Sequence, residues 1–529
     1  MEEHTTAVIA RTPPIAAARP HTAYRWYVLG LLMLVYAFNF IDRQIVTILA
    51  PYIKADLDLT DAQIGLLYGT AFALFYGLFG IPLAKLADGW NRVRTLSLGL
   101  CFWSLMTVCS GTAGNFVQLG LARIGVGIGE ASGTPTSLAL LGDYFPARIR
   151  ATVIAIYSSG IYIGMGASLI LGGSIVAAWD GLAGFNGWQV AFVAVGLPGF
   201  ALSLLVLLTI REPVRGGLDG EPVPADPHPF ATMLSEAATL FPPWSLWTLH
   251  ASGAPARTIR ANGAALIAII AAVALMTWQT DALLSAAHRA PIASIGGFVI
   301  TTNLVQWIVT GVGFYAALSW TQVTRLRDPE AHRQMVGSPV FVAVALSCGL
   351  FAMLMYALGG FAFLYAARYL AFAPQDGVIL GVIAAVAGSG GLLFGGVLGD
   401  AFKRRHPAGR LYLMLAALIV FTAATAIQYT TSSRGIFLTA NFCAMATLTM
   451  YTPLLMGTGQ DLVSARFRAL AAALQILASN IIGLGLGPYL VGFISDVTGN
   501  LQISILSMLA ATPLIALLLL LSIKLSSPR

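Results

Sequence analysis

The sequence has 529 residues, of which 57% are hydrophobic and only 10% are charged. An ordinary soluble domain carries about 25% charged residues, so a water-soluble fold could not bury this much apolar surface. The formal net charge is +7, but the basic residues lie between apolar runs, which indicates a role in membrane topology and not in nucleic-acid binding.

Long apolar runs recur along the whole chain and predict an all-α, polytopic membrane protein. A hydrocarbon core of about 30 Å needs roughly 20 apolar residues per helical crossing, which gives about fourteen spans here. Residues 1–23 contain acidic residues and prolines and lack the pattern of a secretory signal, so we expect a cytoplasmic tail.

The expected spans form two bundles of six helices with an inserted pair between them. The first bundle, in residues 24–211, has spans at about 25–50, 61–87, 91–111, 115–141, 149–178 and 187–210. Residues 212–335 form a cytoplasmic linker, rich in proline at its start, which carries the inserted spans 263–286 and 294–322. The second bundle, in residues 336–529, has spans at about 340–370, 376–399, 409–430, 435–458, 467–493 and 501–524.

Arginine and lysine collect in alternate loops, and this pattern orients the chain. With the N-terminus inside, the expected outer loops hold only four basic residues, Lys54, Arg289, Arg368 and Arg434. Removing one span would mix the inner and outer groups. We therefore expect a multi-pass protein of the inner or plasma membrane with both termini in the cytoplasm.

Two charged motifs occur once in each bundle. Asp88 followed by Arg92 corresponds to Asp400 followed by Arg404, each after a run of small residues at a helix end. Asp143 and Asp461 each precede a second pair of arginines. Internal repeats of this kind are typical of transporter folds. The repeated charges are predicted to form a cytoplasmic gate or, alternatively, only to set topology: Asp88, Arg92, Arg148, Arg150, Asp400, Arg404, Arg466 and Arg468.

These motifs resemble the loop signature of the major facilitator superfamily. Within it the chain resembles the spinster group, through residues 24–27 (YRWY), 39–44 (NFIDRQ), Arg123 with 127–132 (GIGEAS), and 485–488 (GLGP). The resemblance implies two six-helix bundles and secondary transport by alternating access of a lysolipid, a sphingoid-like compound or another amphipathic organic anion. It leaves out residues 212–335, and Gly133 stands where the group often has an aromatic residue.

Four charged residues fall well inside the expected spans: Asp42, Arg43, Arg123 and Glu130. An unpaired charge at mid-membrane costs at least about 2.5 kcal/mol, so such residues are usually functional. Arg123 and Glu130 are seven residues apart and therefore share one helix face. They form either static ion pairs between the first and fourth spans or a substrate and proton site. The desolvation penalty of buried pairs favours the second interpretation.

A carboxylate is the expected proton carrier, because no histidine lies in an expected span. Burial favours the protonated form of a carboxylate, whereas a neighbouring arginine favours the ionised form. Glu130 is predicted to load and release a proton as it gains and loses contact with Arg123. Arg123 would otherwise bind an anionic headgroup. Asp42 and Arg43 are expected to play a similar part nearer the outer side.

The second bundle offers polar and aromatic residues for a substrate cavity, namely Tyr356, Tyr365, Asn441 and Tyr451. Ordinary interhelical hydrogen bonds are an equal alternative for each of them.

Other functional classes find little support in the sequence. There is no GxxxxGK[ST] phosphate loop, and we expect no enzyme activity, no metal, no nucleic-acid partner and no cofactor beyond the coupling proton. A monomer in the lipid bilayer with a small-molecule substrate is the predicted form. The alternative function is an uncoupled facilitator or a multidrug or carboxylate carrier.

Overall fold

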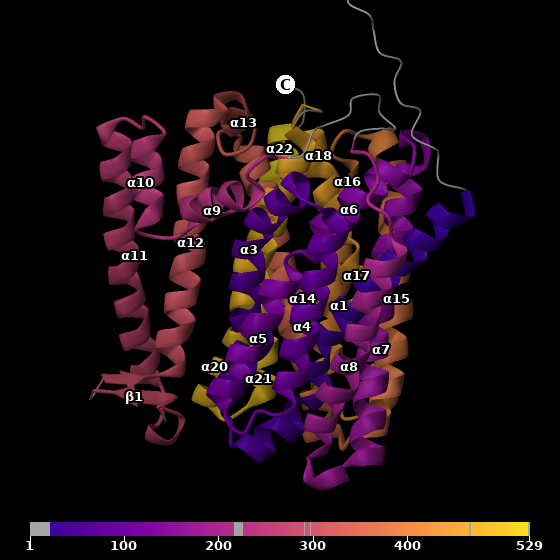
Figure 1. The fold of residues 1–529 in the computed structure, drawn as a ribbon. Coiled ribbons are helices and arrows are strands. Elements are labelled where there is room, and N and C mark those ends of the chain that lie inside the picture. Colours follow the sequence, from indigo (N-terminus) through magenta and orange to yellow (C-terminus); the bar gives the residue numbers. More distant parts are fainter. Residues whose placement is uncertain (1–21, 216–225, 290, 297, 465–466, 527–529) are drawn as a thin grey trace, which may run out of the picture.

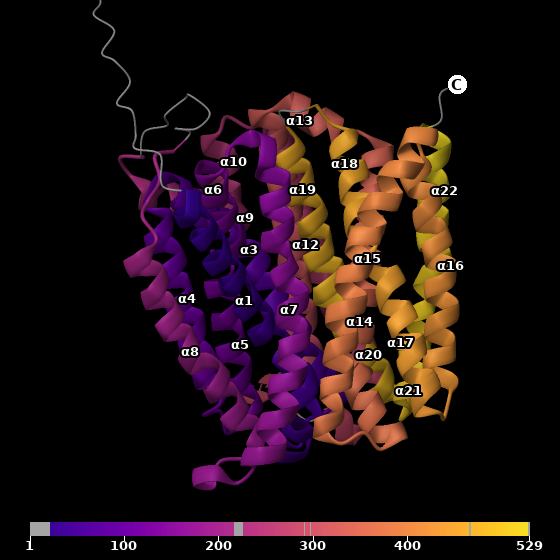
Figure 2. The ribbon, with the colours of Figure 1, turned by 90° about the vertical axis from the view of Figure 1, so that its right-hand side faces the viewer.

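The computed structural model describes residues 22–215, 226–289, 291–296, 298–464 and 467–526. Long helices lie nearly parallel to one another (Figures 1 and 2). Eleven helical segments of the described residues are long and apolar enough to cross a membrane. Three further helical segments, at 116–144, 302–327 and 434–461, run beside them (Figure 1). The predicted all-α architecture of about fourteen spans is therefore confirmed.

The first bundle follows the predicted spans closely. Polar side chains cap its helices at the loops; those of Thr60, Asn91 and Asn115, for example, accept backbone N–H groups. Its elements are α1 (Thr22–Leu57), α2 (Asp61–Gly65) continued by the π-helical η1 (Leu66–Thr70) and α3 (Ala71–Gly89), α4 (Arg92–Ser110), α5 (Phe116–Glu130) with α6 (Gly133–Tyr144), α7 (Ala147–Trp179), η2 (Leu182–Gly184) and α8 (Gly187–Thr209).

The second bundle repeats this plan with more interruptions. The π-helical turn η5 contains Pro453, and η7 directly precedes a turn with Pro488; proline removes a helical hydrogen bond at such places. The elements are α14 (Pro339–Leu370), η4 (Pro374–Asp376), α15 (Gly377–Arg405), α16 (Gly409–Thr430), α17 (Arg434–Thr449), η5 (Thr452–Met456), α18 (Gly457–Asp461), α19 (Arg468–Ala478), η7 (Ser479–Leu484), α20 (Gly485–Thr498), α21 (Leu501–Ser507), η8 (Met508–Ala510) and α22 (Ala511–Ser526).

The inserted pair, α11 and α12, lies beside the first and second bundles (Figure 1). Its segment comprises α9 (Pro229–Leu240), α10 (Trp244–Ala251), α11 (Ala256–Leu283), η3 (Ala286–Arg289), β1 (Ala293–Ile295), β2 (Phe298–Ile300), α12 (Thr302–Arg327) and α13 (Pro329–Gln334). The predicted start of the second inserted span at 294 is wrong. An antiparallel β-hairpin occupies this position, and α12 begins only after Thr301, whose side chain caps it.

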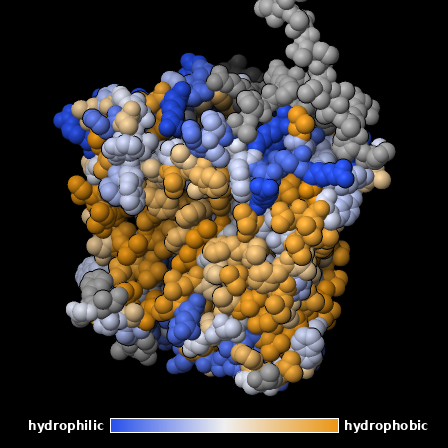
Figure 3. Space-filling model, in the orientation of Figure 1, coloured by the Kyte–Doolittle hydropathy of each residue, from blue (hydrophilic) through white to orange (hydrophobic). Residues whose placement is uncertain are grey.

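The molecule has two ends, one at each end of its long helices. The start of α1 and the end of α22 both lie toward the top of Figure 1, and this is the termini side. The β-hairpin marks the opposite, hairpin side. Between them, hydrophobic side chains form a broad belt (Figure 3). Leu208, Ile267 and Val397 are each about 70% exposed in this belt, as expected for side chains that face lipid.

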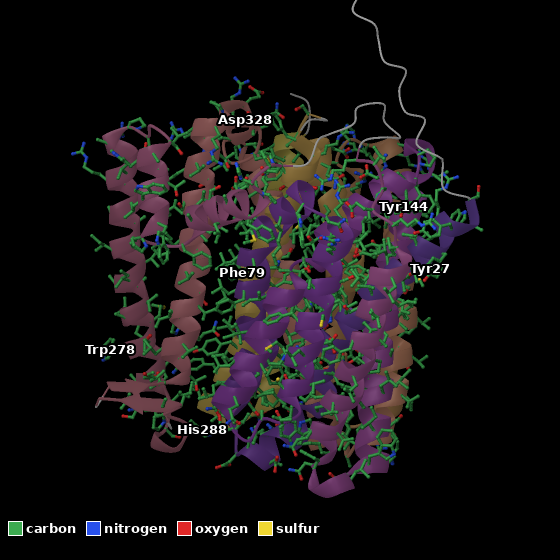
Figure 4. The ribbon with its side chains drawn as sticks, viewed as in Figure 1. Tyr27, Phe79, Tyr144, Trp278, His288 and Asp328 are labelled. Atoms are coloured by element: carbon green, nitrogen blue, oxygen red, sulfur yellow. The ribbon has the colours of Figure 1, made fainter. Side chains whose placement is uncertain are left out.

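The inserted segment is attached to the first bundle on the termini side. The ring centroids of Phe79 in α3 and Phe241, just after α9, are 6.1 Å apart, and Figure 4 shows Phe79 on the side of α3 that faces the inserted helices. Trp90 packs against Phe230 at 5.4 Å. These aromatic contacts hold α9 against the first bundle.

Candidate functional site

The four charged residues of the first bundle meet in one buried cluster between α1 and α5. Glu130 is 0% exposed and Arg123 1% exposed, and Asp42 and Arg43 are also buried. Arg43 Nη2 donates to Glu130 Oε2 at 3.1 Å. Arg123 Nη2 donates to the backbone carbonyl of Asp42 at 3.0 Å. The structure therefore brings together all four residues that the sequence singles out.

Glu130 bonds to Arg43 of α1 and not to Arg123 of its own helix, so this ion pair joins the first and fourth spans, the arrangement that one of the two interpretations of the sequence expects. Seven residues separate Arg123 from Glu130, which is about 10 Å along a helix axis. Arg43 lies opposite Glu130, whereas Arg123 meets the α1 backbone. The Nε and Nη1 atoms of Arg123 have no hydrogen-bond partner among the described residues.

Three aromatic rings surround the guanidinium group of Arg43. Its Cζ atom lies 4.7 Å from the ring centroid of Phe40, 4.4 Å from that of Phe72 and 4.6 Å from that of Tyr76. Such rings stabilise a desolvated cation through cation–π interactions. The sequence analysis missed Phe72 and Tyr76, although two aromatic residues four positions apart share one helix face.

Close packing of α4 against α5 sets the position of Glu130. A Cβ atom on Gly129 would lie 2.9 Å from the backbone nitrogen of Trp103, so only glycine permits this approach. Helix α5 ends at Glu130, and the Ser132 hydroxyl donates to the carbonyl of Gly129 at 2.8 Å. The carboxylate thus lies at a break in the fourth span, at the end of α5.

Two of the four candidates from the second bundle lie toward the interface with the first. Tyr356 of α14 is within electrostatic range of Arg43, and Tyr451 stacks on Phe351 with ring centroids 5.9 Å apart. Asn441 is half-buried on α17.

Tyr365, the remaining candidate, lies apart from the charged cluster. It packs inside the second bundle, where its hydroxyl donates to the carbonyl of Tyr429 at 2.9 Å and its ring stacks on Phe437. Its polar group is therefore satisfied by its own bundle.

On the hairpin side, a second charged cluster joins the two bundles. Asp61, the first residue of α2, pairs with Lys54 and accepts two bonds of 3.2 Å from Arg368 of α14. Asp496 of α20 accepts the backbone N–H groups of Asp61 and Ala62 at 3.0 and 2.8 Å. A carboxylate from one bundle thus caps a helix of the other. The sequence predictions did not include this cluster. Its sign in the sequence is an acidic residue at one end of each of the two spans, Asp61 and Asp496.

On the termini side, Arg92 connects three helices of the first bundle. It bonds to Asp88 of α3 at 3.3 Å and to Asp143 of α6. Arg150 donates to the carbonyl of Gly142 at 2.7 Å.

The matching network of the second bundle uses a different arginine from the predicted one. Arg410, at the start of α16, pairs with Asp400 at 2.5 Å and with Asp461 at 2.7 Å. The predicted partner Arg404 is exposed instead, because the repeat places the bridging arginine at the start of the third helix of each bundle.

The remaining predicted gate residues are placed only in part. Arg468 is exposed, whereas Arg466 and the side chain of Arg148 lie outside the described residues. Among the residues that the structure describes, each of the ion pairs of these two networks joins helices of the same bundle.

Known proteins place the chain in a family. Residues 32–488 match the sequence profile of the Major Facilitator Superfamily. The chain belongs to this superfamily. It is accordingly a multi-pass membrane transporter and not an enzyme.

Two solved structures support the predicted resemblance to the spinster group. They show a bacterial homolog of the human lysosomal transporter Spinster, in inward-facing occupied and unoccupied conformations. Sequence identity is 25% in both, and the TM-scores are 0.68 and 0.69. The alignments cover 95% and 96% of the present chain, and 97% and 100% of the two Spinster-homolog chains.

Curated relatives match shorter stretches. An MFS-type efflux pump of Mycolicibacterium smegmatis is 34% identical over 38% of this chain and 45% of its own length. A hexuronate transporter of Bacillus subtilis is 28% identical over 40% of this chain and 50% of its own length. The chain thus spans about half the length of these relatives.

Proposed function

We propose that the protein is a secondary active transporter that moves a small organic anion with an apolar part, driven by protons that Glu130 carries. The observation that carries the proposal is the burial and the hydrogen bonding of the Arg123 side chain. Its guanidinium is buried, yet its hydrogen bond within the described protein goes to a backbone carbonyl. A buried cation that no carboxylate neutralises directly is suited to an anionic ligand.

Proton coupling follows from the bond between Arg43 and Glu130. Protonation of Glu130 removes its negative charge and weakens the bond to Arg43. The aromatic rings around Arg43 then remain as its contacts. Binding of a proton on one side and release on the other would change how α1 and α5 are held together, which is the step that alternating access requires.

Two classes of substrate fit this site. A lysolipid or sphingoid-like compound is the cargo that the resemblance of the sequence motifs to the spinster group implies. A sugar carboxylate is the second candidate, favoured by the relative named as a hexuronate transporter. A lysophospholipid and a sugar carboxylate both present an anionic group to Arg123, and the lysophospholipid alone of the two has a long apolar part.

The topology belongs to the same proposal. Both termini lie in the cytoplasm, since the arginine-rich loops lie on the termini side, and the protein works as a monomer in the lipid bilayer of the plasma membrane. The hairpin side, where Asp496 caps the helix that begins at Asp61, then faces outward.

Uptake into proteoliposomes tests the function. Labelled lysophospholipid and glucuronate are offered with and without an imposed proton gradient, to the native chain, to Glu130→Gln and to the surface control Glu330→Gln. Gradient-driven uptake that only Glu130→Gln loses is the expected result. Native uptake that ignores the gradient would identify an uncoupled facilitator. Uptake of neither compound would remove the proposed cargo.

A further inference from the structure

A groove of about 380 Å³ lies between α4 and α8, on the outer surface of the first bundle. Each helix contributes four residues with the spacing i, i+3, i+4 and i+7, which places each set on one helix face. The lining residues are Arg94, Ser97, Leu98 and Cys101 of α4, and Phe200, Ser203, Leu204 and Leu207 of α8. None of them belongs to the charged cluster between α1 and α5.

The groove begins where a tight contact between the two helices ends. Nearer the hairpin side, a Cβ atom on Gly196 would lie 2.9 Å from the backbone nitrogen of Val108, so the backbones almost touch there. Toward the termini side, the Ser203 hydroxyl donates to the carbonyl of Ser97 at 2.8 Å. Larger side chains form the walls beyond this bond, and Leu98 is 62% exposed there. The groove is therefore open toward the lipid.

The two ends of the groove differ in polarity. Arg94 lies in the first turn of α4, on the termini side, and its side chain is exposed. Cys101 lies two helical turns deeper, about 10 Å along the axis. Between them, Ser97 is 2% exposed and its hydroxyl has no hydrogen-bond partner among the described residues. One end thus offers a cation and a buried hydroxyl, and the other offers apolar walls.

The charges around Arg94 leave this end basic. Glu212 lies next to it, because it accepts the backbone N–H of Val93 at 3.0 Å. Arg211 and Arg215, which flank Glu212 in sequence, add two positive charges on the same side. An anionic group therefore meets a net positive surface.

We propose that this groove binds an anionic phospholipid from the leaflet on the termini side. Its phosphate contacts Arg94, and one acyl chain follows Leu98, Leu204 and Phe200 toward the bilayer centre. A depth of about 10 Å fits within one leaflet, whose hydrocarbon is about 15 Å thick. Basic pockets between helices at the cytoplasmic surface bind anionic headgroups in this way.

Two native cysteines allow a direct test on the full chain. Cys101 lines the groove, and Cys443 of α17 lies outside it; both are exposed. The rate at which each reacts with N-ethylmaleimide is measured by mass spectrometry in detergent, with phosphatidylglycerol or phosphatidylcholine added. We expect phosphatidylglycerol to slow the labelling of Cys101 selectively. Equal slowing of both cysteines, or no slowing of Cys101, would overturn the proposal.

Variants distinguish binding of the headgroup by Arg94 from binding of an acyl chain in the groove. Arg94→Gln should reduce the protection by phosphatidylglycerol about fivefold, as expected for one basic residue at a membrane surface. Arg257→Gln is the control, because Arg257 is exposed on α11, away from the groove. In this variant phosphatidylglycerol should still protect Cys101. Leu98→Trp should fill the groove and remove the lipid-dependent part of the protection. Equal protection by both lipids, or full protection in Arg94→Gln, would contradict an anionic ligand.

Discussion

The ion pair between Arg43 and Glu130 is buried, and its net contribution to stability is expected to be small because desolvation offsets the Coulomb attraction. The loss of one partner has a different effect, since it leaves an uncompensated charge inside the membrane. Three aromatic rings soften this effect for Arg43. The pair can therefore open at moderate cost when Glu130 is protonated.

Glu130→Ala should lower the free energy of unfolding by about 3–5 kcal/mol, because Arg43 loses its counter-charge. The double variant Arg43→Met with Glu130→Leu should recover most of this loss, since it replaces the pair with apolar groups. Thermal unfolding of the purified protein in detergent measures both. If the double variant is as unstable as Glu130→Ala, the pair does not act as a unit.

Arg123→Lys tests the planar donors of the guanidinium. Lysine keeps the charge but cannot reproduce two parallel N–H bonds to an anion, so KM for the substrate should rise about tenfold or more. Transport assays in proteoliposomes give KM, and Arg257→Lys at the surface is the matched control. An unchanged KM with a lower kcat would assign Arg123 to the conformational step instead.

At the residue scale, the sequence predicted the members of the site and left open which of them pair. A charge inside an apolar run is visible in one dimension, which is why Asp42 and Glu130 stood out. The partner of Glu130 depends on how far α1 and α5 are shifted along each other. Two of the three aromatic contacts of Arg43 come from α3, and no local pattern connects Phe72 with a residue of α1.

The inserted helix α12 is bonded to both bundles. The Thr70 hydroxyl of the first bundle donates to Gln306 Oε1 at 2.5 Å, and Gln306 Nε2 donates to the carbonyl of Gly485 in the second bundle at 3.0 Å. Tyr489 donates to Asn303 at 2.6 Å. On the termini side, α13 packs against the second bundle through Ala331, and Met335 just after it does the same. The inserted pair therefore has to follow any movement between the bundles.

Gln306→Leu should lower stability by about 1 kcal/mol, because Thr70 and the carbonyl of Gly485 each lose a hydrogen bond to Gln306, although the Thr70 hydroxyl still donates to that carbonyl at 2.6 Å. It should also change the transport rate, since α12 no longer connects the bundles on the hairpin side. Gln322→Leu is the matched control, because the hydrogen bond of the Gln322 side chain in the described part of the chain lies within the inserted pair, to Asn262 at 2.7 Å. Equal effects of both variants on the transport rate would contradict a connecting role of Gln306.

Element positions could be predicted where an apolar run decides them, but element interruptions could not. The span expected at 115–141 is split between α5 and α6. This break, at Ala131, could not be predicted because the sequence stays apolar through it. The hairpin before α12 was missed because it too is apolar. The limits of the domains, at 211 and 336, stay a prediction.

At the scale of the whole molecule, both seams between the bundles are closed on the hairpin side. Gly492 of α20 packs directly on the backbone of Asp61 in α2. In the other seam, a Cβ atom on Gly381 of α15 would lie 2.6 Å from the carbonyl of Gly166 in α7. Alternating access therefore has to break the charged cluster of Asp61 and Asp496 before the bundles can separate here.

Asp496→Asn should favour opening of the hairpin side. The amide keeps the shape of the side chain but loses the negative charge that stabilises the N-terminus of α2, an interaction of about 1 kcal/mol or more when partly buried. A shift of this size changes the ratio of open to closed states about fivefold.

Spin labels are placed at positions 55 and 498, at the ends of α1 and α20. Double electron–electron resonance spectroscopy should then show a longer distance between the two labels when the hairpin side opens. Labels on Lys85 and Arg405 report the termini side, where the distance should shorten as the hairpin side opens. A hairpin side that opens while the termini side keeps its distance would contradict alternating access, because the two sides would then move independently. If neither distance changes, the contact of Asp496 with α2 is not what holds the hairpin side closed.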